Sequence, residues 1–129
     1  MMTEAERLAR RFYQAVDARD YVHASNLLSD DVDFRFGSGV PTTGRQGFDT
    51  FVAVGLGPNI KSISHRLLYT WTVESCPSTF ICEMEVTYTR SDDSTLTLPC
   101  MSKLQVREGR ISVLRVYMDI NPALESPSS

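Results

Sequence analysis

The chain has 129 residues, of which 42% are hydrophobic and 22% charged, and its formal net charge at pH 7 is −3. This length suits one domain with a single core, and the composition is typical of a soluble globular protein. The 13 Lys and Arg residues are spread along the chain, which argues against nucleic acid as a partner. No apolar run approaches the roughly 20 residues that span a bilayer, and the N-terminus lacks a signal-peptide pattern. We therefore expect a cytoplasmic protein with no membrane partner.

Helical patterns dominate the first half of the chain. Thr3 and Glu6 form a capping-box pair at the start of one helix, and Asp20 can cap the next. A short strand is predicted where apolar and polar residues alternate, with Phe34 and Phe36 on one side of it. After a stretch rich in turn residues, apolar residues return at helical spacing. In chain order, the predicted segments are helices over 3–20 and 21–28, a strand over 31–36 and a helix over 45–56.

Strand patterns dominate the second half. Four long segments are rich in Thr, Val, Ile and aromatic residues, and short turn-forming stretches separate them, so they predict an antiparallel meander. Helices followed by a curling antiparallel sheet indicate an α+β fold, one domain over residues 1–129, with the helices packed on one face of the sheet. We expect the tail after about residue 124 to be loose. The four strand segments are 60–74, 79–90, 95–107 and 110–119.

Alternation along these strands separates an apolar face from a mixed one. Two polar residues, Tyr88 and Ser102, lie in phase with the apolar face, where they could orient a ligand carbonyl or hydroxyl or simply bond to nearby backbone. The side chains expected to converge on one apolar volume are Phe34, Phe36, Met84, Leu98, Cys100, Val116 and Met118. The opposite face is polar and aromatic, and its members include Glu83, Glu85, Arg115, Tyr117 and Asp119.

His65 is one of only two histidines in the chain and falls early in the first long strand. It could be a core residue, a metal ligand or a catalytic base. No second His or Cys lies at ligand spacing on a shared face, so we expect no metal. The three cysteines, Cys76, Cys82 and Cys100, lack C-x-x-C spacing and favour reduced thiols over a disulfide framework.

The order of these elements, with "GVPTTGR", "VTYTRSDDSTLTLP" and "REGRISVLRVYMDINPAL", resembles the SnoaL-like polyketide cyclase branch of the nuclear-transport-factor-two-like superfamily. The resemblance covers essentially the whole chain. It implies a cone-shaped fold in which three N-terminal helices close a curved sheet over a deep apolar pocket. Relatives include ketosteroid isomerase, limonene epoxide hydrolase, scytalone dehydratase and a dehydrochlorinase, and many members bind ligands without catalysis, so the fold alone decides little.

Transferring the relatives' motifs residue by residue narrows the chemistry. The base of ketosteroid isomerase falls at Phe36 and its tyrosine at Phe12, so that mechanism is absent. The epoxide-hydrolase triad is absent too, because its three positions fall on Val86, Met84 and Val116.

The dehydratase and dehydrochlorinase pattern fits better, because Asp17 and His65 match its Asp near the end of the first helix and its His early in the first long strand. An Asp bonded to one ring nitrogen makes the other a general base. Two observations count against this dyad. Asp17 lies well off the apolar stripe of its helix, and Phe34 replaces a dehydratase tyrosine.

Two hypotheses follow. The first is a cofactor-independent lyase, isomerase or cyclase acting on a small apolar metabolite, such as a polyketide or terpenoid fragment, with His65 as base, Asp17 as its partner, and Tyr13, Tyr88 and Ser102 as polar contacts. The second is a binding module that holds a hydrophobic ligand without turnover. In either case the mixed outer face of the sheet, where the superfamily commonly dimerises, predicts a homodimer.

Overall fold

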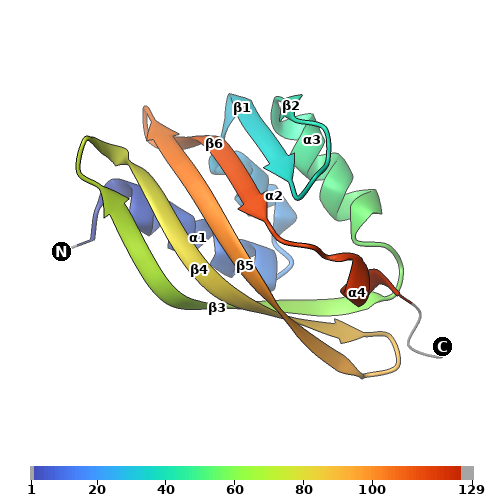
Figure 1. Cartoon of the computed structure of the whole chain (residues 1–129). Helices are drawn as coiled ribbons and strands as arrows, with labels where there is room; N and C mark the ends of the chain where they lie inside the picture. Colours follow the sequence, from blue (N-terminus) through green and yellow to red (C-terminus); the bar gives the residue numbers. More distant parts are fainter. Residues whose placement is uncertain (1, 126–129) are drawn as a thin grey trace.

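The computed structural model describes residues 2–125 as a six-stranded curved sheet with helices packed on it. The predicted loose tail therefore lies outside the described residues, except for its first position. Figure 1 shows the elements in chain order. They are α1 (Glu4–Asp17), α2 (Tyr21–Asn26), β1 (Leu28–Phe36), β2 (Thr42–Thr43), α3 (Arg45–Thr50), the π-helical turn η1 (Phe51–Gly55), β3 (Ile60–Val73), β4 (Cys76–Arg90), β5 (Thr95–Arg107), β6 (Arg110–Tyr117) and α4 (Asn121–Leu124).

The first two helices begin at the predicted caps. The Thr3 hydroxyl accepts a hydrogen bond from the Glu6 N–H at 3.1 Å, and the Asp20 carboxylate accepts one from the His23 N–H at 3.1 Å. Each cap satisfies a backbone donor that the first turn of a helix leaves free. The helix α1 ends at Asp17, and Arg19 then adopts a positive φ of 59° that turns the chain into α2.

The sheet order is β2-β1-β6-β5-β4-β3. The predicted antiparallel meander is confirmed for β3 to β6. The strand β1 differs, because it pairs with β6 in parallel. Parallel neighbours need a long connection, and the path from β1 through β2, α3, η1 and β3 to β5 supplies it. Local alternation predicts a strand at β1, but it carries no information on the partner or its direction.

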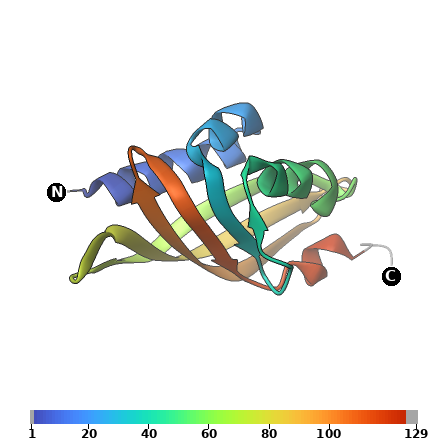
Figure 2. The same ribbon diagram turned by 90° about the horizontal axis from the view of Figure 1, so that it is seen from above.

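The helices α1, α2 and α3 lie on one side of the curved sheet (Figure 1; Figure 2). The apolar stripe of α1 packs on the sheet, and the alternating strand residues meet it, so one continuous core fills the space between the layers. The other face of the sheet is open. In residues 2–125, no helix is long and apolar enough to cross a membrane.

Candidate functional site

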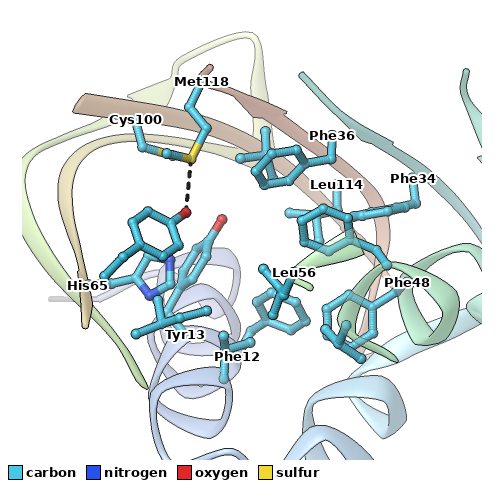
Figure 3. Close-up of a pocket in the computed structure, with 16 residues that line it drawn as sticks. Phe12, Tyr13, Phe34, Phe36, Phe48, Leu56, His65, Cys100, Leu114 and Met118 are labelled. Atoms are coloured by element: carbon cyan, nitrogen blue, oxygen red, sulfur yellow. Dashed lines mark hydrogen bonds between the residues drawn. The ribbon is translucent and has the colours of Figure 1, made fainter. Parts of the chain in front are cut away.

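A narrow apolar cavity of about 50 Å³ lies between α1, the α3–η1 segment and the sheet (Figure 3). Eight of the predicted site residues line it: Tyr13, Phe34, Phe36, His65, Tyr88, Cys100, Val116 and Met118. They come from α1 and from β1, β3, β4, β5 and the end of β6. The alternation that defined the apolar face therefore located six of the sixteen wall residues, all of them on the sheet or directly after β6.

Met84 and Ser102 lie elsewhere in the core. Met84 is fully buried, but it does not line the cavity. The Ser102 hydroxyl lies 2.5 Å from the Tyr13 hydroxyl in a buried hydrogen bond. Ser102 therefore holds the hydroxyl of Tyr13, which lines the cavity, but does not line the cavity itself.

Asp17 and His65 meet where the end of α1 crosses the start of β3. Asp17 Oδ1 lies 2.6 Å from Nδ1 of the His65 ring, and Asp17 Oδ2 accepts the His65 backbone N–H at 2.8 Å. The side chain of His65 is 10% exposed and that of Asp17 is 27% exposed. One carboxylate therefore holds both the backbone and the ring of the histidine.

This geometry resolves the helical-wheel objection to Asp17. As the last residue of α1, it is free of the packing that fixes the stripe in the preceding turns, so its side chain can reach sideways to β3. Asp17 does not itself line the cavity. Because Nδ1 is engaged, the nitrogen left to face the cavity is Nε2, which has no hydrogen-bond partner within residues 2–125.

Tyr13 packs against the histidine ring. The two ring centroids are 4.6 Å apart with a 42° tilt. Tyr13 therefore limits rotation of the imidazole ring, and Asp17 holds the ring at Nδ1. Burial raises the pKa of the Tyr13 hydroxyl well above its usual value, and Ser102 already bonds it. Tyr13 is therefore a neutral positioning residue, and its hydroxyl is engaged.

Tyr88 carries the second of the two hydroxyl groups in the cavity wall, after that of Tyr13. It is 3% exposed, and its O–H donates to Met118 Sδ at 3.5 Å, the dashed line in Figure 3. Burial raises the pKa of Tyr88, which keeps the phenol neutral. Burial also raises the pKa of the Cys100 thiol to about 11 and that of Cys82 to about 12. These thiols act as small apolar groups, as the sequence predicts.

Half of the wall residues were not predicted from the sequence, and most of these lie on the helices or at their ends. The missed residues are Phe12 and Val16 on α1, Phe48 on α3, Phe51 and Val52 on η1, and Leu56, Ile63 and Leu114. The spacing of Phe48, Val52 and Leu56 by four residues was a usable signal, since such residues share one helix face. Within η1, the Leu56 N–H bonds the Phe51 carbonyl at 3.2 Å, and the Phe51 ring stacks on Phe36 with centroids 4.3 Å apart.

The outer face of the sheet carries exposed aromatic and apolar side chains in register. Cross-strand pairing aligns Tyr69, Glu83, Met101 and Tyr117 in one row across β3, β4, β5 and β6. Tyr117 is 55% exposed, and Tyr69, Met101 and the nearby Trp71 are also exposed.

The polar members of this face bond locally. Arg115 pairs with Asp33 at 2.5 Å, Arg66 pairs with Glu85, and the Asp119 carboxylate accepts the Asn121 N–H at 3.0 Å, just before α4. None of these three pairs lies in the cavity wall. Within the described residues, no three His, Cys, Asp or Glu side chains come close enough to hold a metal ion.

A family model described as a SnoaL-like domain matches residues 9–114. The chain belongs to this family. Three solved structures show the same fold. An NTF2-like protein of unknown function from Burkholderia pseudomallei is 15% identical, with a TM-score of 0.80 and coverage of 95% of this chain and 96% of that one. TerC, co-crystallised with polyporic acid, is 15% identical, with a TM-score of 0.78 and coverage of 98% and 100%.

The third is RV0760c from Mycobacterium tuberculosis, in complex with estradiol-17β-hemisuccinate. It is 17% identical, with a TM-score of 0.77 and coverage of 93% of this chain and 97% of that one. At these identities the likeness shows the fold alone. No curated protein sequence matches the chain.

Proposed function

We propose that this protein is a cofactor-independent lyase, isomerase or cyclase that acts on a small, largely apolar metabolite of polyketide or terpenoid type. His65 is the general base and Asp17 its partner. The observation that carries the proposal is the pair of hydrogen bonds that the Asp17 carboxylate accepts from the His65 backbone and ring. A histidine placed only for packing has no need of a carboxylate on both its backbone and its Nδ1.

The chemistry follows from the geometry. A carboxylate beside Nδ1 favours the tautomer that carries its proton there, which leaves a lone pair on Nε2. When Nε2 takes a proton from a substrate carbon, the same carboxylate stabilises the imidazolium that forms. The apolar wall excludes water from this step, which strengthens the interaction between the charged groups.

The nature of the wall supports a small apolar substrate. Aromatic and aliphatic side chains make up most of it, and such pockets bind ligands chiefly through apolar contact. Two proteins of the same fold were crystallised with small organic molecules, estradiol-17β-hemisuccinate and polyporic acid. The cavity of about 50 Å³ is smaller than a typical ligand pocket of several hundred Å³. The side chains that line it must therefore move when a ligand binds.

The test is proton exchange on carbon. The protein is incubated in D₂O with a panel of apolar ketones and 1,3-diketones, and ¹H NMR follows the loss of the exchangeable C–H signals. The wild type should accelerate exchange for part of the panel, and His65→Gln should lose the acceleration. His23→Gln is the matched control, because it makes the same change at the other histidine, on α2. Equal rates for wild type and His65→Gln would contradict the proposal.

A non-catalytic hydrophobic ligand-binding module is the alternative, and one feature favours it. The positions that hold catalytic groups in ketosteroid isomerase and epoxide hydrolase carry Phe12, Phe36, Val86 and Val116 here, and all but Phe36 are fully buried or nearly so. A binding module would hold the same ligands with no exchange on carbon. The D₂O experiment therefore separates the two functions directly.

We also propose that the protein is a homodimer joined through the outer face of the sheet. The row of Tyr69, Met101 and Tyr117, with Trp71 beside it, presents large apolar side chains to solvent. Contiguous exposed apolar surface is typical of an interaction site. A stable dimer of this kind buries on the order of 1,000 Å² or more.

A further inference from the structure

The cavity offers a ligand two polar groups, one without a hydrogen-bond partner in residues 2–125 and one that has only a weak partner. Among the lining residues, Tyr13, His65 and Tyr88 carry nitrogen or oxygen in their side chains. The Tyr13 hydroxyl is bonded to Ser102, and Nδ1 of His65 is bonded to Asp17. What remains is Nε2 of His65 and the hydroxyl of Tyr88.

The Tyr88 hydroxyl has a weak partner for so buried a group. The residue is 3% exposed, and the hydroxyl's acceptor is a thioether sulfur 3.5 Å away. Thioethers are weak acceptors, and a buried O–H without a strong acceptor is costly. A ligand oxygen that replaced the sulfur would give this donor a full hydrogen bond.

The sheet register places Tyr88 beside His65. Ile63 pairs with Tyr88 and His65 pairs with Val86 across β3 and β4, so His65 and Tyr88 are diagonal neighbours on one face, with Cα atoms about 7–8 Å apart. Both side chains line the cavity. A base and a donor at this separation can act on the same small group of atoms, one on a carbon and the other on a nearby oxygen.

The charge of the cavity wall also limits which oxygen-containing group of a substrate can bind beside Tyr88 and His65. None of the lining residues is Lys or Arg, so this wall offers no cation to pair with a carboxylate or phosphate. The oxygen that enters should be neutral in the bound substrate. A carbonyl oxygen is neutral, accepts hydrogen bonds and acidifies the C–H bonds on the adjacent carbon.

We propose that the Tyr88 hydroxyl donates a hydrogen bond to the carbonyl oxygen of the substrate, and that the substrates are uncharged, enolisable ketones with an apolar body. This inference rests on the proposed function of His65. Nε2 takes the proton from the carbon next to the carbonyl, the C–H electron pair forms a C=C bond, and the carbonyl π electrons move to the oxygen. The enolate oxygen then accepts the Tyr88 hydrogen bond. In a β,γ-unsaturated ketone, return of the proton to the γ carbon as the carbonyl re-forms completes an isomerisation; in a ketone with a leaving group on the β carbon, re-formation of the carbonyl with departure of that group and its bonding electron pair completes an elimination.

The test uses a matched pair of probes, 2-indanone and indane, which differ by one carbonyl group. Their affinities are measured for the wild type, Tyr88→Phe and Tyr69→Phe. Tyr69→Phe makes the same change on the outer face of the sheet. Infrared spectra of bound 2-indanone report the carbonyl stretch, and NMR in D₂O reports exchange of its α protons. Melting temperatures confirm that each variant is folded.

In the wild type, the carbonyl stretch of bound 2-indanone should lie below its value in an apolar solvent. Tyr88→Phe should abolish this shift, lower the preference for the ketone by about tenfold and slow the exchange by about a hundredfold or more. Tyr69→Phe should change none of these.

A wild type that does not prefer the ketone to indane, or a carbonyl shift that survives in Tyr88→Phe, overturns the assignment of Tyr88. If the shift depends on Tyr88 while neither the wild type nor any variant exchanges protons, the assignment of Tyr88 stands and the proposed catalysis by His65 fails.

Discussion

Replacing Asp17 with Asn perturbs the candidate site at one atom. In the wild type the two carboxylate oxygens accept two hydrogen bonds from His65, one from the backbone N–H at 2.8 Å and one at the ring, 2.6 Å from Nδ1. The Asn amide has one acceptor oxygen, and its NH₂ group is a donor. The variant can keep both contacts only if its NH₂ group donates to Nδ1, and this forces the ring into the tautomer that carries its proton on Nε2, where the lone pair of the base is needed. It also lacks the negative charge that stabilises an imidazolium.

The loss of stability and the loss of catalytic activity expected for Asp17→Asn differ greatly in size. One lost charge-assisted hydrogen bond costs roughly 1.5–3 kcal/mol when fully buried. Because Asp17 is 27% exposed, we expect a cost below this buried range, about 1 kcal/mol, and a fall in Tm of roughly 4 °C. The catalytic loss should be on the order of 10²–10⁴-fold, the usual contribution of a positioned general base. Activity should therefore fall far more than stability.

The assay pairs calorimetry with NMR-detected exchange in D₂O on the best ketone from the panel. Asp93→Asn serves as the control, because Asp93 is an exposed carboxylate that pairs with Lys61 at 2.5 Å, away from the cavity. The control should keep full exchange activity. An Asp17→Asn protein that exchanges protons at the wild-type rate would refute the role given to Asp17. An unfolded Asp17→Asn protein would show instead that the contact mainly holds α1 on β3.

Three further outcomes are expected. Small apolar ligands should raise Tm in a thermal-shift screen while nucleotides should not, because the cavity wall is apolar; stabilisation by nucleotides alone would contradict the pocket assignment. Tyr117→Glu should convert a dimer into a monomer in sedimentation at tens of micromolar, whereas a wild type that is already monomeric there removes the proposed interface. Iodoacetamide at pH 8 should label Cys76 before Cys82 and Cys100, as read by mass spectrometry. Hydrogen bonds from Thr79 and Ser78 lower the pKa of Cys76, so more thiolate is present there, whereas burial raises the other two pKa values to about 12 and 11. Equal labelling of all three would contradict that environment.

Alternation and capping predicted the elements well because both are local. The third long strand has the predicted bounds, 95–107, and Thr3 and Asp20 cap the helices they were expected to cap. The parallel pairing of β1 with β6 could not be predicted in this way. Pairing direction depends on how the chain returns across the sheet, and no local pattern records that path.

Part of the candidate site was also predicted, because alternation along a strand is a local pattern. Residues on strands, such as Tyr88 and Val116, follow from alternation, and His65 with Asp17 came from a family resemblance. The helical wheel argued against Asp17, because a wheel assumes regular packing to the last residue and Asp17 is the residue at which α1 ends. Leu56, by contrast, could have been predicted, because it follows Phe48 and Val52 at helical spacing and lines the cavity with them.

The proposed chemistry requires that Asp17 holds His65 with its proton on Nδ1 and its lone pair on Nε2. Long-range ¹H–¹⁵N NMR of ¹⁵N-labelled protein, recorded at a pH where the ring is neutral, measures the tautomer directly, and His65→Gln assigns the signals. We predict a protonated Nδ1 and an unprotonated Nε2 for His65, and an ordinary tautomer mixture for His23. A His65 ring that carries its proton on Nε2, or that exchanges freely between the two forms, would contradict the proposed chemistry.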